Sequence, residues 1–177
     1  MHPSTRLCLK QLEMMAKSRD RGLEGQSVLD FGCGTGLLAI SAVKMGAESA
    51  IGIDIVAETA QTARRNVALN RLSEKITIRC GGWEQVDQKY DLIFANLVAA
   101  ALLRSGGRIP HYLKKDGRVI LSGFSLKQMG AMVSFFITSG LKVIDQSAQD
   151  GWGLLLMGHG QRIQKTFKTN RRISNKE

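Results

Sequence analysis

The sequence has no long hydrophobic run, and this absence is the first feature that limits its class. None of its apolar stretches approaches the roughly 20 residues that a membrane-spanning helix needs. The N-terminus, Met-His-Pro-Ser-Thr, lacks the basic and then apolar pattern of a signal peptide. Cysteine is also scarce, with three residues and no CxxC pair. These absences predict reduced thiols, no membrane association, and a cytoplasmic protein without a metal site.

The charge is one-sided and unevenly distributed. The 177 residues carry a formal net charge of +10, and their 44% hydrophobic and 23% charged composition is typical of one globular domain. Residues 160–177 hold six basic side chains against one acidic side chain, that of Glu177. Such a segment either contacts RNA or a ribosomal particle through phosphates, or is a solvated, disordered end. We expect a folded domain at 1–159 and a basic, disordered tail at 160–177.

Hydrophobic periodicity predicts an alternation of strands and helices. Strands are expected at 28–31, 50–53, 75–79, 91–95, 118–122, 142–145 and 152–157, the last two joined by a loop at 146–151. Helices are expected at 3–19, 37–45, 57–70, 129–139 and, broken near Gly106 and Pro110, at 97–115. This order indicates an α/β protein with a seven-stranded, mainly parallel sheet that has one antiparallel edge strand.

The stretch Val-Leu-Asp-Phe-Gly-Cys-Gly-Thr-Gly at 28–36 organises the rest of the chain. It reads as a buried strand that runs into a glycine loop and then into an apolar helix, whose N-terminal N–H groups and dipole favour a polar ligand. Asp54 follows the next predicted strand, 22 residues after Gly32, where a carboxylate can accept hydrogen bonds from a ribose. The pattern predicts a nucleoside-containing cofactor.

The spacing of the glycines decides between cofactor classes. A dinucleotide fingerprint needs its third glycine at position 37, where this chain has leucine. The observed spacing Asp30-x-Gly32-x-Gly34-x-Gly36 resembles motif I of the class I methyltransferases that use S-adenosylmethionine. Gly82-Trp83 after the third predicted strand and Asn96 after the fourth also match that class. The resemblance implies its Rossmann-like, three-layer α/β sandwich.

A narrower resemblance rests on several blocks of the sequence. The blocks His-Pro-Ser-Thr-Arg-Leu-Cys-Leu at 2–9, Ala-Asn-Leu-Val-Ala at 95–99 and Leu-Ser-Gly-Phe at 121–124, together with 28–40 and 51–55, look like successive blocks of the PrmA family. That family methylates the ribosomal protein of the large-subunit stalk base, L-eleven. The similarity covers about residues 2–158. We expect the N-terminal substrate-recognition domain of PrmA-like enzymes to be absent, which leaves the methyl acceptor open.

The resemblance implies a role for each candidate site residue. Thr5 would contact the methionyl carboxylate of the cofactor, Asp54 the ribose hydroxyls, and Asn96 the reactive end. Other interpretations stay open: a first-turn helix residue for Thr5, a surface acid for Asp54 and a helix cap for Asn96. Trp83 would either stack on or flank adenine, or cover the sheet edge. The remaining cofactor-binding candidates form or support the glycine loop: Asp30, Gly32, Gly34 and Gly36.

These assignments predict an S-adenosylmethionine-dependent N-methyltransferase that acts on amino groups of a protein. In-line methyl transfer depends on positioning, so Asn96 is assigned to orienting the acceptor amine, and no general base is assigned. The chain lacks both the proline pair of adenine-N6 enzymes after Asn96 and the Pro-Cys pair of cytosine-C5 enzymes. Two alternatives remain: a cofactor-binding module without catalysis, and an RNA methyltransferase guided by the basic tail.

Overall fold

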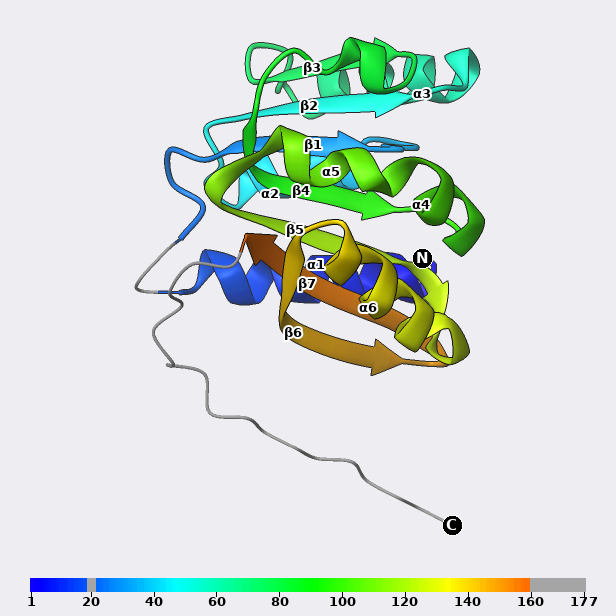
Figure 1. The fold of residues 1–177 in the computed structure, drawn as a ribbon. Coiled ribbons are helices and arrows are strands. Elements are labelled where there is room, and N and C mark those ends of the chain that lie inside the picture. The colour runs from blue at the N-terminus through cyan, green and yellow to red at the C-terminus, as the bar shows by residue number, and fades with distance from the viewer. Residues whose placement is uncertain (19–21, 160–177) are drawn as a thin grey trace.

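The fold is a seven-stranded sheet with helices on both sides, seen in a computed structural model that describes residues 1–18 and 22–159 (Figure 1). The strands are β1 (Ser27–Phe31), β2 (Ser49–Asp54), β3 (Ile76–Cys80), β4 (Tyr90–Asn96), β5 (Leu113–Ser125), β6 (Leu141–Gln149) and β7 (Trp152–His159). The α-helices are α1 (Pro3–Ala16), α2 (Leu37–Lys44), α3 (Ala57–Leu69), α4 (Ala99–Ser105), α5 (Ile109–Tyr112) and α6 (Met129–Thr138). Three 3-10 turns complete it: η1 (Trp83–Gln85), η2 (Gly106–Arg108) and η3 (Leu126–Gln128).

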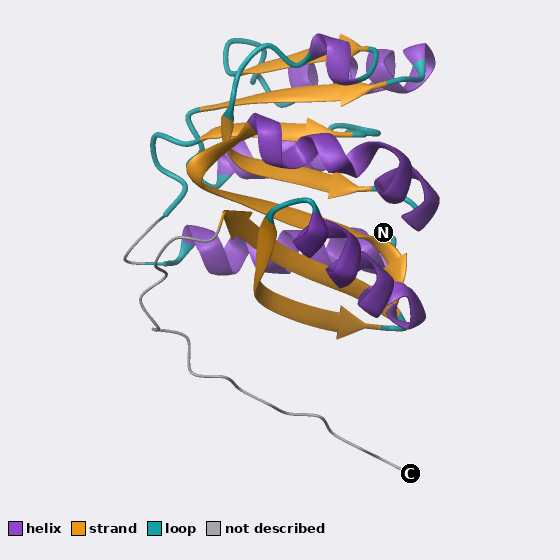
Figure 2. Cartoon of the chain, in the orientation of Figure 1, coloured by secondary structure: helices purple, strands orange, loops and turns teal. Residues whose placement is uncertain are grey.

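The helices form two layers, three on each face of the sheet (Figure 2). Along β4, Leu92 and Phe94 join the core under α1, α2 and α3, while Ile93 and Ala95 join the core under α4, α5 and α6. This alternation follows from the period of two along a strand whose faces are both covered. Asn96 lies two residues after Phe94, so its side chain lies on the same side of the sheet as Leu92 and Phe94, the side that carries α1.

The predicted fold class is confirmed, and so is a single antiparallel strand in a mainly parallel sheet. The strand order is β3-β2-β1-β4-β5-β7-β6, in which β7 runs antiparallel to both β5 and β6. In Figure 1 the arrowhead of β7 points opposite to those of the parallel strands. The expectation that the antiparallel strand forms the edge is wrong, because β7 lies one place inside β6.

Burial explains why β7 takes the inner position. Leu154 and Leu156 of β7 enter one core and Leu155 and Met157 enter the other, so the strand is buried on both faces. Most residues of β6 are exposed, and its polar side chains, among them Lys142 and Gln146, suit an edge. The predicted loop at 146–151 is instead a tight hairpin, because β6 extends to Gln149 and pairs there with Trp152.

Two helix predictions are wrong at their ends. Helix α1 ends at Ala16; residue 19 of the predicted range lies outside the described residues. The stretch 97–115 is divided into α4, η2 and α5, and Leu113 already belongs to β5, where it pairs with Tyr90. A Cβ on Gly106 would lie 2.8 Å from the Phe136 ring, so this break also lets α6 pack closely. The predicted tail at 160–177 lies outside the described residues as well.

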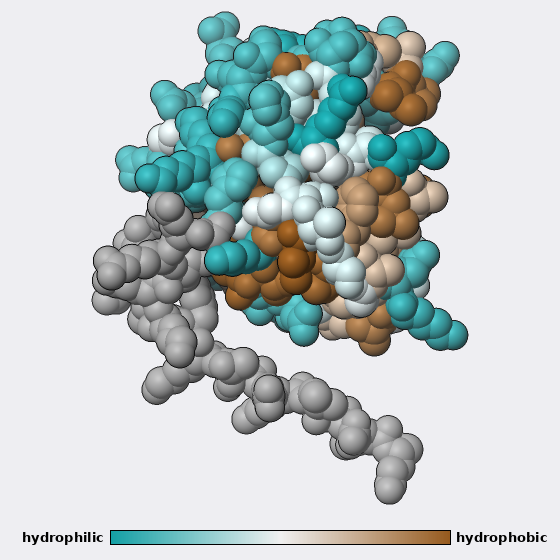
Figure 3. Space-filling view, in the orientation of Figure 1, coloured by the Kyte–Doolittle hydropathy of each residue, from teal (hydrophilic) through white to brown (hydrophobic). Residues whose placement is uncertain are grey.

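The surface on the side of α4, α5 and α6 has both hydrophobic and hydrophilic regions. Figure 3 shows hydrophobic surface over α4 and α6, whose exposed apolar side chains include Leu103 and Ile137, and hydrophilic surface over the β3 end of the molecule. Within residues 1–18 and 22–159, none of the helices is long and apolar enough to cross a membrane.

Candidate active site

Asp30 anchors the helix that follows the glycine loop. Its side chain is 1% exposed within β1, and its carboxylate accepts a hydrogen bond of 3.1 Å from the N–H of Ala39, in the first turn of α2. Burial raises the pKa of Asp30 to about 7. The hydrogen bond from Ala39 lowers this pKa, and the charge of Asp54 raises it further. This hydrogen bond ties the strand β1 to the first turn of α2, on either side of the glycine loop.

The three loop glycines have different surroundings, although all have left-handed backbone, with φ of 76°, 56° and 79° at Gly32, Gly34 and Gly36. A Cβ on Gly32 would lie 2.3 Å from Cδ2 of Leu97, so the loop after β4 packs directly on this glycine. A Cβ on Gly36 would contact Ala63 of α3. A Cβ on Gly34 would meet nothing within 4 Å. A ligand can therefore approach the loop at Gly34.

Asp54 fixes this open part of the loop. Its Oδ2 accepts a hydrogen bond of 2.9 Å from the N–H of Gly34, and its Oδ1 accepts one of 3.0 Å from the N–H of Val56. A carboxylate oxygen can accept two hydrogen bonds, so each oxygen keeps capacity for a hydroxyl donor. The carboxylate is thus held at the end of β2, against the backbone N–H of Gly34.

Asn96 and Thr5, which are 91 positions apart in the chain, are brought together in the fold. The amide Nδ2 of Asn96 donates a hydrogen bond of 3.2 Å to the hydroxyl Oγ1 of Thr5. The amide Oδ1 of Asn96 is buried and has no hydrogen-bond partner among the described residues. An unpaired buried acceptor costs about 1–3 kcal/mol. That cost is recovered when a ligand supplies a donor at this point.

Leu97 and Gly123 hold the loop after Asn96, and sequence reasoning assigned neither of them a role. The N–H of Leu97 donates a hydrogen bond of 3.1 Å to the carbonyl of Ser122. Gly123 has a φ of 90°, and a Cβ there would lie 2.4 Å from the carbonyl oxygen of Leu97. The chain at Leu97 is therefore confined between Gly32 and Gly123. Gly123 lies in one of the family-like blocks, which was the only signal for it.

Trp83 lies on the other side of the sheet. Its indole stacks on Phe31 at 3.9 Å between ring centroids and on Tyr112 at 5.2 Å, and it is 6% exposed. It belongs to the core under α4, α5 and α6, whereas Thr5 comes from α1 on the opposite face. Trp83 thus packs on the sheet and is not brought together with Thr5 and Asn96; its contact with a cofactor stays a prediction.

The buried thiols of the site are poor nucleophiles. Burial, helped by the charge of Asp30, raises the pKa of Cys8 to about 12 and also raises that of Cys33. The described part of the chain contains no group of three or more His, Cys, Asp or Glu that could hold a metal ion. The side chains that converge here can bind and orient a polar ligand by hydrogen bonds, and covalent catalysis has no candidate nucleophile among them.

Comparison with known proteins agrees with this geometry. A family model described as ribosomal protein L11 methyltransferase (PrmA) matches residues 1–159. The chain belongs to the PrmA family. A PrmA relative from Hamiltonella defensa, named ribosomal protein L11 methyltransferase, is 39% identical over 122 residues, which cover 69% of this chain and 38% of that protein. A relative of the same name from Desulfotalea psychrophila is 32% identical over 157 residues and covers 88% of this chain and 51% of that protein.

A solved structure supports the same assignment. The crystal structure of ribosomal protein L11 methylase from Lactobacillus delbrueckii subsp. bulgaricus superimposes with a TM-score of 0.82 at 29% identity, over 91% of this chain and 81% of that chain. The chain spans about half, or less, of the length of the curated PrmA relatives described above. The family match at 1–159 includes the glycine loop, Thr5, Asp54 and Asn96 of this chain.

Proposed function

We propose that residues 1–159 form the catalytic domain of an S-adenosylmethionine-dependent N-methyltransferase that acts on amino groups of a protein. The observation that carries the proposal is the Asn96 amide, which is fixed by Thr5 through Nδ2 and leaves Oδ1 buried and unpaired. Membership of the PrmA family supports this reaction class. Ribosomal protein L11, named for the relatives, is the candidate acceptor. A ribosomal acceptor would locate the protein in the cytoplasm.

The chain offers suitable groups for each part of the cofactor. The Asp54 carboxylate can accept hydrogen bonds from the two ribose hydroxyls, because each of its oxygens accepts one backbone N–H and keeps capacity for a second donor. The Thr5 hydroxyl can donate to the methionyl carboxylate while it accepts from Asn96. Asp30 and the glycines hold the loop in shape for this ligand. S-adenosylmethionine supplies a methyl group on a sulfonium, which an amine can accept by in-line displacement.

Asn96 prepares the acceptor amine in this mechanism. A lysine amine with a pKa of about 10.4 is mostly protonated at neutral pH, at a cost of roughly 4–5 kcal/mol for the neutral form. Desolvation by the surrounding side chains lowers the pKa of the amine. The Asn96 oxygen then accepts one N–H of the neutral amine and directs its lone pair. No residue of the chain is assigned as a base, so the proton leaves to water.

Transfer of labelled methyl groups tests the proposal. The full chain is incubated with labelled S-adenosylmethionine and bacterial ribosomal subunits, and the protein and RNA fractions are counted separately. Label in a protein of the size of L11 is the expected result. Asn96→Ala should reduce that label by about 100-fold, because the amine loses its orienting acceptor, whereas Asn70→Ala, at the distant end of α3, should not change it.

Two results would contradict the proposed acceptor or the proposed chemistry. Label in RNA alone would favour an RNA methyltransferase. Cofactor binding without label in either fraction would leave a binding module.

The basic segment 160–177 is proposed as a contact for ribosomal RNA. Six basic side chains in 18 residues can neutralise phosphates and release counterions, which makes affinity fall as salt rises. Deletion of 160–177 should weaken binding to ribosomal subunits and flatten its dependence on salt. Unchanged binding would contradict the contact without affecting the methyl-transfer proposal.

A further inference from the structure

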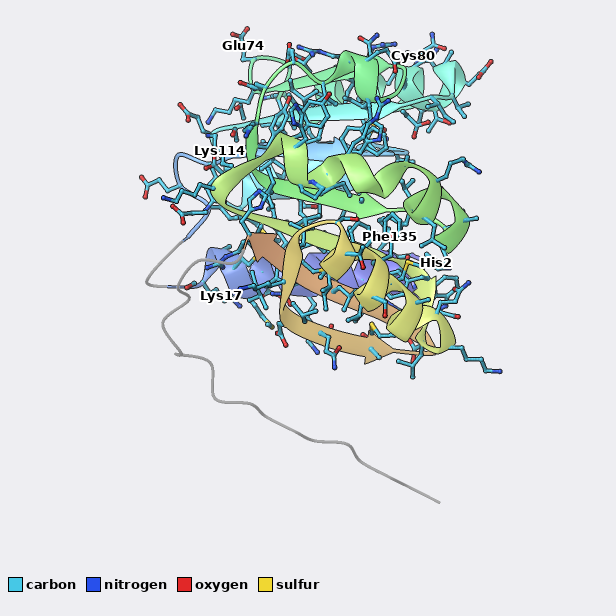
Figure 4. All side chains as sticks on the ribbon, in the orientation of Figure 1. His2, Lys17, Glu74, Cys80, Lys114 and Phe135 are labelled. Atoms are coloured by element: carbon cyan, nitrogen blue, oxygen red, sulfur yellow. The ribbon has the colours of Figure 1, made fainter. Side chains whose placement is uncertain are left out.

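The first turn of α1 is attached to the turn of the β6–β7 hairpin. The rings of His2 and Trp152 meet edge to face at 4.3 Å between centroids and 75° between planes. The guanidinium of Arg6 donates to the carboxylate of Asp150, with 2.9 Å between the nitrogen and Oδ2. Figure 4 labels His2 at the end of α1 that lies at the carboxyl ends of the parallel strands. Two independent contacts thus join segments almost 150 residues apart.

The hairpin turn is a rigid anchor. Asp150 and Gly151 have φ of 51° and 78°, the left-handed conformations of a two-residue hairpin turn that twists with its strands. The carbonyl of Gly151 accepts a hydrogen bond of 2.8 Å from the N–H of Leu126, just after β5. Trp152 pairs with Gln149 in β6 and with Ser125 in β5. The turn therefore belongs to the sheet and moves with it.

Thr5 lies between the two anchored residues, the N-cap His2 and Arg6 of α1. The carbonyl of His2 accepts hydrogen bonds of 3.1 Å from the N–H groups of both Thr5 and Arg6. The His2 ring also caps the helix, because its Nδ1 accepts from the N–H of Ser4. A displacement of His2 or Arg6 would consequently displace Thr5, which is the hydrogen-bond partner of Asn96.

We propose that Asp150 and Trp152 are positioning residues for the Asn96 amide. They hold the first turn of α1 so that the Thr5 hydroxyl fixes the orientation of the amide and leaves its oxygen facing the reacting amine. Helix ends open readily unless side chains satisfy and hold them. The part of this inference that concerns catalysis rests on the proposed function; the part that concerns the amide does not.

The test uses variants that remove one contact at a time. Asp150→Asn removes the charge and keeps the turn, since asparagine tolerates left-handed backbone. Trp152→Leu removes the edge-to-face contact, and Trp152→Phe keeps a ring for His2. Glu13→Gln is the matched control. It removes an exposed ion pair at the opposite end of α1, in which Nζ of Lys17 lies 2.6 Å from Oε1 of Glu13. Figure 4 labels Lys17.

The first readout needs no cofactor. Nuclear magnetic resonance of the full, unliganded chain follows the side-chain amide of Asn96 and hydrogen exchange of residues 4–8. Exchange should rise about threefold in Asp150→Asn, as a surface ion pair allows, and about tenfold in the double variant with Trp152→Leu. The Asn96 amide resonance should shift in both variants. Trp152→Phe and Glu13→Gln should leave both signals unchanged, and an unshifted Asn96 resonance in the double variant would overturn the proposal.

The second readout separates positioning from general stability. The double variant should lower the kcat for methyl transfer by about tenfold in the wild-type background and have no further effect in Asn96→Ala, because both changes act through one amide. Equal losses in the two backgrounds would overturn the positioning role. A wild-type chain that transfers no methyl group would contradict the proposed function, and the resonance experiment would still decide whether the hairpin orients Asn96.

Discussion

The Asn96 amide nitrogen lies 3.2 Å from the hydroxyl of Thr5, and the two residues are 91 positions apart in the chain. Asn96 ends a central strand of the sheet, and Thr5 comes from the first turn of a helix that covers one face of it. This hydrogen bond uses the donor side of the amide and leaves the acceptor side buried and unpaired. It therefore decides which atom of the Asn96 amide is left without a partner.

The Thr5 hydroxyl is expected to stabilise the fold as well as the site. In Thr5→Val the Asn96 amide loses its acceptor with little change of shape, so the free energy of unfolding in urea should fall by about 1 kcal/mol. Thr5→Ser keeps the hydroxyl and should remain within about 0.5 kcal/mol of wild type. A loss in Thr5→Ser with none in Thr5→Val would show that packing of the methyl group, and not the hydrogen bond, is responsible.

Gly123 is expected to tolerate no side chain. Gly123→Ala would place a Cβ 2.4 Å from the Leu97 carbonyl oxygen at a φ of 90°, and should lower the free energy of unfolding by about 2–4 kcal/mol. Gly130→Ala is the matched control, because its Cβ would meet nothing within 4 Å at a helical position. This variant should raise the free energy of unfolding by about 0.5 kcal/mol. Similar effects at both positions, measured by urea unfolding, would contradict the confinement of Leu97.

The Asp30 carboxyl should make stability depend on pH. Its pKa is raised from 3.8 to about 7 in the folded protein by burial. Between these values the folded state holds a proton that the unfolded state releases, so this contribution is present below about pH 4 and is lost as pH rises toward 8. The stability of wild type relative to Asp30→Asn should fall across this window by roughly 2–4 kcal/mol. If the stability of the two proteins changed with pH in parallel, the raised pKa of the buried Asp30 carboxyl would be contradicted.

Much of the fold follows from local pattern. The apolar strand before Gly32 and the glycine spacing predict a loop between strand and helix, and the structure forms it with left-handed backbone at Gly32, Gly34 and Gly36. Ala60, Ala63 and Val67 share the buried face of α3 as helical spacing indicates. These features depend on neighbours in sequence, which is why a single sequence contains them.

Features set by distant contacts were less visible. The inner place of β7 depends on burial of both its faces. The Asp-Gly pair at 150–151 is a local signal for a hairpin turn, and in the structure it forms that turn within the predicted loop at 146–151. The early start of β5 depends on the pairing of Leu113 with Tyr90.

The site shows the same division. Thr5, Asp54 and Asn96 could be named from family-like blocks, because each lies at an element end with a matching motif. The hydrogen bonds between Thr5 and Asn96, and between Asp54 and the loop, could not be predicted from the sequence. Trp83 fits its motif position, yet its stacking on Phe31 and Tyr112 depends on side chains from β1 and α5 that no local pattern joins to it. Leu97 lies in the family-like block at 95–99, but its contact with Gly32 cannot be inferred from that block.

A calorimetric titration of the full chain with S-adenosylmethionine tests the central claim most directly. The site predicts one binding event per chain, weakened at least about tenfold in Asp54→Ala because the ribose loses its acceptors, and unchanged in Asp145→Ala on the exposed edge strand β6. Thermal unfolding of Asp54→Ala, with Asp54→Asn as a second variant, checks that the loop still folds. Binding by wild type that both Asp54 variants retain, or no binding by wild type, would contradict a cofactor site between the glycine loop, Asp54 and Asn96.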